Sequence, residues 1–243
     1  MFAGIDIGNT TVRICFFDNF GNLLDNFIIY EINNIDFKYL ISVLENVNCS
    51  VIVSVVDRIE NEFIKIFKNF SIEFYQINKD QIDSIDFSSY TSYLGSDRVA
   101  TCLGGLYYDK LPFCIIDMGT ATTFSVVDKN KKYQGGFIIP GIGTMLRSLN
   151  EFTAKLPLVN INDEIEFKLG LNTEDNIRNG IYLLNFEGIK HILNNIKKSY
   201  PDITFIGTGG WSRIFNKIFD INDPLLIFRG MNYFIRRKVL NVI

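Results

Sequence analysis

A hairpin-shaped motif occurs twice in the chain, and this repetition constrains the fold more than any other feature. The first copy is "IDIGNTTVRICFFD" (residues 5–18) and the second is "IDMGTATTFSVVD" (residues 116–128). Each copy reads as a strand, a D-x-G-x-x-T bend and a second strand, followed by a polar turn and a third apolar run. With Phe2 aligned to Phe113 and no gap, the matched residues are Phe2, Ile5, Asp6, Gly8 and Thr11 with Phe113, Ile116, Asp117, Gly119 and Thr122.

The elements after each hairpin also follow a similar order. The first half continues with a helix near residues 35–47, a buried strand at 50–56 and a helix near 63–70. The second half has a long helix at 173–198, with Thr173 at the N-cap position, and then a strand at 203–210. Strands mixed with helices in this order predict an α/β fold with a mixed sheet in each half. We expect halves 1–112 and 113–243, with one bend on each wall of a cleft between them.

The composition excludes several classes of function. The net charge of −3 offers no basic surplus for a nucleic-acid backbone. No segment approaches the ~18 apolar residues that cross a bilayer, and the chain enters a strand at once without a basic leader. We therefore expect a cytoplasmic protein with neither a nucleic-acid nor a membrane partner.

The metal-binding and nucleophilic residue types are also sparse. The four cysteines are scattered in apolar runs, which favours buried core thiols. The single histidine, His191, lies in a stretch that reads as an exposed helix, so a zinc site or a Ser-His triad is hard to build. Acid-base chemistry would have to come from carboxylates.

The two bends have the residue types of a phosphate site. A glycine beside a carboxylate exposes backbone N–H groups, and neighbouring Thr and Asn side chains add neutral donors. Asp6 and Asp117 would repel a nucleotide unless cations lie between them and the phosphates, and Mg²⁺ prefers oxygen ligands. Alternatively both acids only cap their turns. The presence of two related bends and a third Gly-rich strand end, "GTGG" (207–210), favours nucleotide binding. The run "GGFIIPGIG" (135–143) fits equally a loop near phosphates or a strand and a turn.

A third carboxylate lies between the halves, in "LGSDR" (94–98). The apolar spacing predicts a helix after Gly95 that starts at Ser96 or Asp97. Asp97 is either a helix cap or a functional acid. In the functional interpretation the helix N-terminus keeps it ionised, so that it accepts a proton from a substrate hydroxyl, while Arg98 meets an anionic group.

These motifs together resemble one family. The segments "DIGNTTVR", "LGSDR", "IDMGTATTFSVVD", "GGFIIPGI", "TAKLP", "NTEDNIRNGI" and "GTGG" are similar, in order from Phe2 to about Gly210, to type III pantothenate kinase. That family belongs to the superfamily of acetate kinase, sugar kinase, Hsp70 and actin proteins. The resemblance implies two ribonuclease H-like halves in an actin-like ATPase fold. It also implies ATP-dependent phosphorylation of pantothenate to 4'-phosphopantothenate, the first step towards coenzyme A, with Mg²⁺, a monovalent cation (K⁺ or NH₄⁺) and a homodimer.

The resemblance also implies roles for individual residues. Asp97 would accept the proton, Asp117 would hold the monovalent cation, and Asp6 is a further candidate ligand for Mg²⁺. The ATP-binding residues would be Asp6, Ile7, Gly8, Asn9, Thr10, Thr11, Val12, Arg13 and Thr120. The pantothenate-binding residues would be Tyr90, Gly95, Ser96, Asp97, Arg98 and Thr173.

The chain departs from the family pattern at two places. The family often has "GADR", and we expect the serine at position 96 to alter little. The segment before it, "YTSYLGSDR", lacks a proline and is shorter, so the substrate tyrosine is Tyr90 or Tyr93, and we favour Tyr90. Two other functions stay open: a non-catalytic nucleotide-binding regulator and a phosphohydrolase on the same fold.

Overall fold

The computed structural model describes residues 1–240, with residues 25 and 26 as backbone only. The chain divides into two compact units. Unit 1 combines Met1–Asp109 with the segment from Leu225 onward, and unit 2 is Lys110–Pro224. Each unit contains one sheet, and each sheet carries one of the two bends.

Unit 1 is built on a five-stranded sheet of order β3-β2-β1-β4-β5. β1 pairs antiparallel with β2 and parallel with β4, so the sheet is mixed. The strands are β1 (Phe2–Ile7), β2 (Thr11–Phe17), β3 (Leu23–Glu31), β4 (Cys49–Ser54) and β5 (Glu73–Gln76). The helices are α1 (Phe37–Leu44), α2 (Asp57–Asn69), α3 (Ser96–Gly105) and α6 (Leu226–Lys238), with the short 3-10 turns η1 (Lys79–Gln81) and η2 (Leu106–Tyr108).

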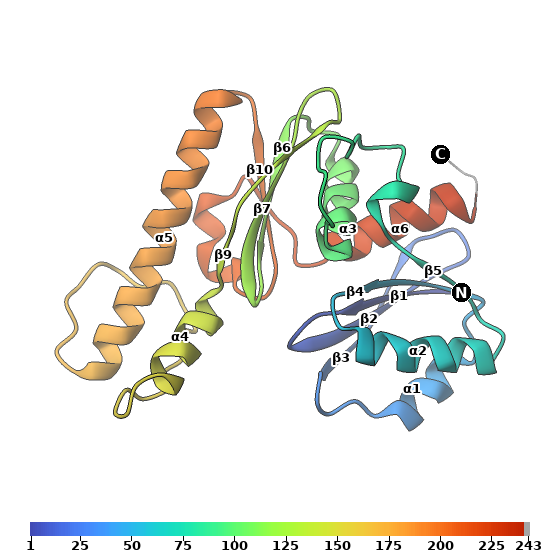
Figure 1. Ribbon diagram of the computed structural model, residues 1–243, viewed down its shortest axis with the longest axis horizontal. Helices are drawn as coiled ribbons and strands as arrows, with labels where there is room; N and C mark the ends of the chain where they lie inside the picture. Colours follow the sequence, from blue (N-terminus) through green and yellow to red (C-terminus); the bar gives the residue numbers. More distant parts are fainter. Residues whose placement is uncertain (241–243) are drawn as a thin grey trace. The chain divides into compact units, whose positions relative to one another are not determined.

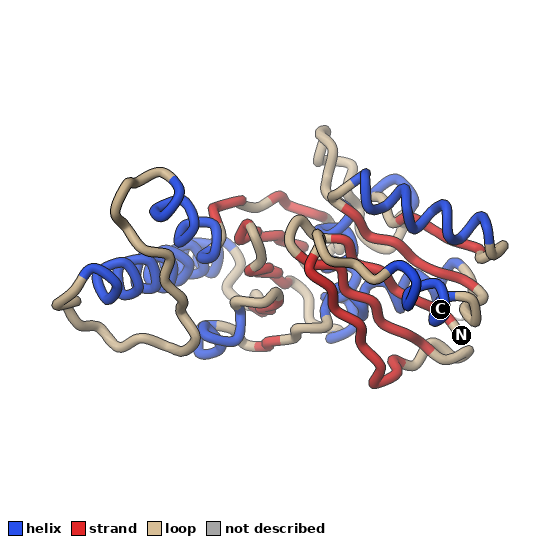
Figure 2. Tube along the Cα trace, turned by 90° about the horizontal axis from the view of Figure 1, so that it is seen from below, coloured by secondary structure: helices blue, strands red, loops and turns tan. Residues whose placement is uncertain are grey.

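The core of unit 1 lies between this sheet and its helices. The helices α1 and α2 cover one face, and α3 and α6 lie on the other (Figure 1). Apolar side chains of β1 and β2 pack against Leu40 and Leu44 of α1 and against Phe63 and Phe67 of α2. These helix residues recur at intervals of four, which places them on one side of each helix. The neighbouring twisted strands of the sheet are seen side by side in Figure 2.

Unit 2 has a six-stranded mixed sheet whose main path is β11-β10-β6-β7-β8, with β9 also paired to β7. The strands are β6 (Phe113–Met118), β7 (Ala121–Val127), β8 (Tyr133–Gly135), β9 (Ile138–Pro140), β10 (Thr204–Thr208) and β11 (Ile221–Asn222). The helices are α4 (Ile142–Glu151) and α5 (Thr173–Ser199), with the 3-10 segment η3 (Ser212–Ile218). Buried residues of α5, among them Ile181, Ile189 and Leu193, pack against the sheet.

The C-terminal helix α6 belongs to unit 1. It lies directly against α3, where a side chain at Gly230 would come 1.8 Å from the backbone oxygen of Ala100. Only glycine permits two helix backbones to approach this closely. The sequence division into 1–112 and 113–243 grouped this helix with the second half, whereas its contacts group it with the first. The first boundary differs only slightly, after Asp109 instead of residue 112.

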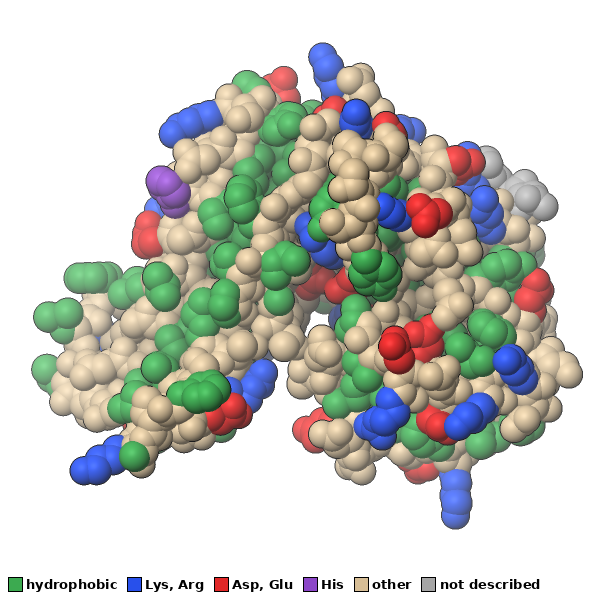
Figure 3. All heavy atoms as spheres, in the orientation of Figure 1, with side chains coloured by type: hydrophobic (Ala, Val, Ile, Leu, Met, Phe, Trp, Pro, Cys, Tyr) green, Lys and Arg blue, Asp and Glu red, His purple; other side chains and the backbone are tan. Residues whose placement is uncertain are grey.

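Most predicted elements are present with shifted ends. The long helix is confirmed at Thr173–Ser199, but the segment after Trp211 is a 3-10 helix. The run 135–143 contains β9 and the start of α4. All four cysteines are buried thiols, as expected. His191 is exposed on α5 and is the purple side chain in Figure 3.

Candidate active site

The first bend joins β1 to β2 in unit 1. The amide of Gly8 donates to the carbonyl of Thr11 at 2.9 Å, which closes the turn. Asn9 and Thr10 are exposed at its tip. Ile7 and Val12 are buried in the core, so these two of the predicted ATP-binding residues can offer a ligand only their backbone groups.

Asp6 at the end of β1 forms an ion pair with Arg13 of β2. The two residues are direct partners in the strand register. Arg13 donates through Nε to Asp6 Oδ2 at 2.8 Å, and its second nitrogen lies 2.6 Å from the same oxygen. The carboxylate is buried, and burial raises its pKa, although the charge and hydrogen bond of Arg13 act in the opposite direction. Both contacts fall on Oδ2.

Phe228 of α6 supports this ion pair from the far end of the sequence. Its ring centroid lies 5.5 Å from the guanidinium carbon of Arg13, a cation–π distance. The phenyl ring is itself buried and meets Phe27 edge-on at 5.8 Å. The sequence analysis missed Phe228, because no local motif marks it.

Asp97 lies in the first turn of α3 and is not the helix cap. The N-cap residue is Gly95, and Asp97 Oδ1 accepts from the amide of Arg98 at 2.8 Å. A side chain at Gly95 would come 2.4 Å from that carboxylate oxygen, so glycine is needed for Asp97 to take this position. We expected the helix N-terminus to keep Asp97 ionised. The amide and the charge of Arg98 act in that direction, but burial outweighs them and raises the pKa of Asp97 above its ordinary value.

Asp97 and Asp6 are brought near one another within unit 1. The Asp97 carboxylate contributes to the raised pKa of Asp6 by like-charge repulsion. Arg98, the neighbour of Asp97, is buried as well, with 8% of its surface exposed. Two acids and two arginines therefore share the region where β1 ends and α3 begins. A proton acceptor with a raised pKa beside a paired carboxylate is suited to proton transfer.

The second bend, between β6 and β7, corrects the sequence alignment. The amide of Gly119 donates to the carbonyl of Ala121, so this turn is one residue shorter than the first. The strands β2 and β7 have the same burial pattern when Thr11 is matched with Ala121. The match of Thr11 with Thr122 was therefore wrong. Thr122 is buried, and within the described residues its hydroxyl has no hydrogen-bond partner.

Asp117 faces a different environment from Asp6. Its register partner on β7 is Thr123, a neutral residue in the position that Arg13 takes in the first hairpin. Gly209 at the end of β10 makes room for it, because an added side chain would lie 2.5 Å from Asp117 Oδ1. Gly209 also has a φ of +86°, which favours glycine. Asp117 itself is half-buried.

Three chain segments meet around the second bend. The amide of Gly141 donates to the carbonyl of Thr120 at 3.0 Å, and the hydroxyl of Thr144 donates to the same carbonyl at 2.6 Å. The amide of Trp211 donates to the carbonyl of Met118 at 3.1 Å. The start of α4 and the "GTGG" strand end are thus both held against the bend, while the Thr120 side chain stays exposed. The exposed Thr120 hydroxyl is a neutral donor that suits a phosphate oxygen.

The predicted pantothenate-binding residues Thr173, in unit 2, and Tyr90, in the loop before α3, differ in their exposure. Thr173 is not an N-cap, because Asn172 caps α5 by accepting from the amide of Asp175 at 2.8 Å. Thr173 is exposed and lines a groove of about 380 Å³ with Leu149 and Ile177. Tyr90 is half-buried, with the Lys79 ammonium 5.8 Å from its ring centroid.

Tyr93 is different, because 81% of its surface is exposed. The ordered surroundings of Tyr90 favour it as the substrate tyrosine, and this choice stays a prediction.

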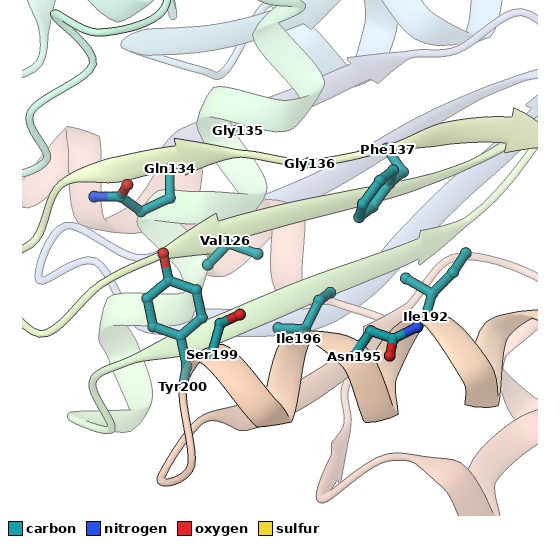
Figure 4. A pocket seen from close by; sticks show the side chains of 10 residues that line it. All are labelled: Val126, Gln134, Gly135, Gly136, Phe137, Ile192, Asn195, Ile196, Ser199 and Tyr200. Atoms are coloured by element: carbon teal, nitrogen blue, oxygen red, sulfur yellow. The ribbon is translucent and has the colours of Figure 1, made fainter.

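A second groove in unit 2, of about 510 Å³, contains none of the predicted site residues. It lies between the β8–β9 edge and the last turns of α5, with Gln134, Phe137 and Tyr200 around it (Figure 4). No charged residue lines it. It therefore offers no carboxylate to accept a proton and no charged side chain to pair with a phosphate.

Proteins of a known family match nearly the whole chain in sequence. The sequence pattern of the type III pantothenate kinase family matches residues 4–195. A type III pantothenate kinase from Fervidobacterium nodosum is 32% identical over 246 residues, which cover 96% of each chain. One from Bifidobacterium animalis subsp. lactis is 32% identical, covering 95% of this chain and 97% of that protein.

Solved structures give the same fold at lower identity. A Campylobacter jejuni protein assigned to the Baf family of transcriptional activators has a TM-score of 0.64 at 23% identity, covering 97% of this chain and 98% of that one. A Sinorhizobium meliloti protein assigned as a 2-dehydro-3-deoxygalactonokinase has a TM-score of 0.62 at 8% identity, covering 98% and 97%. These structures establish a sugar-kinase-like fold, with two mixed sheets flanked by helices. The sequence matches go further: this chain belongs to the type III pantothenate kinase family.

Proposed function

We propose that the protein transfers the γ-phosphoryl group of ATP to the primary hydroxyl of pantothenate, giving 4'-phosphopantothenate and ADP. This reaction is the first step of coenzyme A biosynthesis. Family membership supports the choice of substrate. The observation that carries the mechanism is Asp97, a carboxylate with a raised pKa at the start of α3, close to the Asp6–Arg13 pair.

Asp97 acts as the proton acceptor. The pantothenate hydroxyl oxygen forms a bond to the γ-phosphorus while the bond from that phosphorus to the β–γ bridging oxygen breaks, and the electron pair leaves on ADP. The hydroxyl proton passes to the Asp97 carboxylate. Such a transfer depends on positioning and charge neutralisation more than on a strong base. The backbone of Gly95 and Ser96 and the charge of Arg98 surround Asp97. The side chains of Tyr90 and Thr173 contribute to pantothenate binding.

Each bend offers groups that suit phosphates and cations. In unit 1, residues 6–13 present the exposed Asn9 and Thr10 and the turn amides to ATP. In unit 2, Thr120 contributes from the second bend. Mg²⁺ is commonly held by one or two carboxylates together with phosphates and water. The Asp6 carboxylate fits this use, because its Oδ1 is outside the ion pair and a cation would offset its burial.

A monovalent cation fits the second bend. Asp117 is half-buried, its register partner is neutral, and its Oδ1 lies against Gly209, where a side chain would not fit. Within the described residues no three His, Cys, Asp or Glu side chains cluster as metal ligands. Phosphate, water and backbone oxygens would therefore supply the other ligands of either ion. The Mg²⁺ ion lowers the charge repulsion between ATP and the acids when it is bound.

We further propose that the protein is a cytoplasmic homodimer. Several large apolar side chains of the segment after α4 are exposed, and they support a covered surface: Phe152 (86%), Phe167 (80%), Leu169 (83%) and Leu171 (98%). Hydrophobic side chains also gather on the α4–α5 side of unit 2 in Figure 3. Exposed apolar residues grouped in this way favour a protein interface. Across residues 1–240, no helix has the length and apolar character to span a membrane.

Two other functions remain as alternatives. A nucleotide-binding regulator of this fold is suggested by the relative assigned to a transcriptional activator family, but that likeness at 23% identity concerns the fold alone. A regulator has no need for a buried proton acceptor such as Asp97. A phosphohydrolase would use the same bends and transfer the phosphoryl group to water.

A coupled assay for ADP tests the proposal. With Mg²⁺ and K⁺ present, ADP should appear only when pantothenate is added. Asp97→Asn should lower turnover about 10²–10⁴-fold while ATP binding stays near wild type. Asp80→Asn, a matched change of an exposed acid, should have no effect. ADP release without pantothenate would indicate a phosphohydrolase, and no release under any condition would favour the regulator. Full turnover of Asp97→Asn would remove Asp97 from the mechanism.

A further inference from the structure

The strand β4 extends beyond its neighbour β5 at the end where α3 begins. The parallel pairing of these strands runs from Cys49–Glu73 to Ile52–Gln76, and the amide of Ile77 donates to the carbonyl of Ile52. Alternate residues of a strand direct their backbone groups to the same side. Ser54 therefore directs its N–H and C=O to the side of β5, at a level that the β4–β5 pairing no longer reaches.

The hydroxyl of Ser96 binds these two backbone groups of Ser54, which β5 does not reach. Ser96 Oγ accepts from the amide of Ser54 at 3.1 Å and donates to the carbonyl of Ser54 at 2.9 Å. Ser96 is 8% exposed, and both bonds are partly buried. Buried backbone groups that lack a partner are costly, so one hydroxyl that satisfies two of them holds its own segment firmly.

This contact fixes the first residue of α3 to the sheet. On its other side β4 pairs with β1, where Asp6 is the register partner of Val53 and Ile7 that of Ser54. Ser96 therefore ties the helix start to the same level of the sheet at which Asp6 lies. The hydrogen bonds between Ser96 and Ser54 therefore set the position of the next residue, Asp97, relative to Asp6.

We propose that Ser96 is a positioning residue that sets the place and the burial of Asp97, and that its hydroxyl does not bind substrate. The hydroxyl is already used as both donor and acceptor by Ser54. We expected the serine to alter little relative to alanine, and its two partly buried bonds to Ser54 are the reason to propose a larger effect. The inference rests on the proposed role of Asp97 as proton acceptor.

Ser96→Ala tests the proposal through turnover. The loss of both bonds should loosen the start of α3 and lower kcat about 10–100-fold, the scale of a small misplacement of a catalytic group. KM for pantothenate should stay within about twofold, because no substrate contact is lost. Ser96→Thr keeps the hydroxyl and should restore most of the turnover. A raised KM with an unchanged kcat would show instead that the hydroxyl binds pantothenate.

The pH profile gives a second readout that a merely structural role would not move. Turnover needs ionised Asp97, so kcat should rise with pH through the raised pKa of that carboxyl. Ser96→Ala should expose Asp97 and shift this rise to lower pH, towards the ordinary range of an aspartate. Ser54→Ala is the matched control, because it keeps the backbone groups that Ser96 binds and removes only a hydroxyl that accepts from Val56. Its pH profile should match that of the wild type, and an unchanged profile in Ser96→Ala would overturn the proposal.

A double variant separates this proposal from the proposed function. If Ser96 acts through Asp97, Ser96→Ala should cause little further loss of turnover in the Asp97→Asn background. A full additional loss would overturn the positioning role. If Asp97→Asn alone retained full turnover, the role of Asp97 would fail, whatever the result for Ser96. Thermal unfolding of each variant confirms that the compared proteins are folded.

Discussion

The two bends share a motif but differ in how their acids are balanced. In unit 1, Asp6 faces Arg13 across the hairpin and is neutralised by it. In unit 2, Asp117 faces Thr123, and its carboxylate lies against Gly209, where a side chain would not fit. The first acid is held by the protein's own cation, whereas the second has no such charge as its register partner. A repeated backbone motif therefore does not imply a repeated electrostatic role.

The difference arises from the length of the turn. One residue fewer between Gly119 and the second strand shifts the register, so Thr123 and not Phe124 lies opposite Asp117. A shift of one residue exchanges the two faces of a strand. Without the shorter turn, the half-buried position opposite Asp117 would carry a phenylalanine. The short bend thus keeps the surroundings of Asp117 small and polar.

The largest expected effect comes from removing the cation of the first bend. Arg13→Met should lower the free energy of unfolding by about 1–3 kcal/mol at neutral pH, because Asp6 loses its partner while buried. This loss is smaller than is usual for a broken buried ion pair, because the Arg13 side chain is 27% exposed. Urea unfolding at pH 8 and pH 5 measures it, and the deficit should shrink at lower pH as Asp6 becomes protonated.

The matched change in the second bend is Thr123→Val. It removes no charge, so its effect on unfolding should stay within about 0.5 kcal/mol. Equal losses in Arg13→Met and Thr123→Val would contradict the view that only the first bend depends on an internal ion pair.

A smaller effect is expected from closing the space beside Asp117. Gly209→Ala should cost about 1–2 kcal/mol, because alanine is strained at a φ of +86° and its Cβ would displace the carboxylate. It should also reduce the rise in Tm that K⁺ produces over Na⁺, since ion binding to the folded state stabilises it. Gly210→Ala is the control, as no atom lies within 4 Å of its added Cβ. An unchanged K⁺ response in Gly209→Ala would argue against a cation at Asp117.

The smallest effect is expected for Asp97, the acid that lies outside both bends. Burial raises the folded-state pKa of Asp97, so its contribution to stability is present at low pH and is lost as pH rises through that pKa. Asp97→Asn should therefore increase the free energy of unfolding at pH 8, within the roughly 0.5–2 kcal/mol of typical stabilising substitutions, and the gain should be lost at acid pH. Asp202→Asn, a change of an exposed acid, should show no such trend. A gain that does not depend on pH would exclude burial of the charge as its cause.

Much of the site was predictable because it follows local rules. The strand, bend and strand pattern around Asp6 and Asp117 depends on alternation and on glycine, which are visible in a short window. The helix after Gly95 was predicted from apolar spacing and is present at Ser96–Gly105. The hydroxyl bonds of Ser96 could not be predicted, because Ser54 is 42 residues away and only the early end of β5 leaves its backbone groups to be satisfied. The position of Phe228 over Arg13 could not be predicted for the same reason, because the two residues are far apart in the sequence.

By itself, then, the sequence determined the α/β class, the two bends and their acids, and the family. These features depend on residue type and on short-range periodicity, which the chain carries in any conformation. Only the tertiary structure decided the register of the second hairpin, the return of α6 to unit 1, the Asp6–Arg13 pair and the raised pKa of Asp97. Those features depend on which distant groups share a buried space, and burial is a property of the folded chain alone.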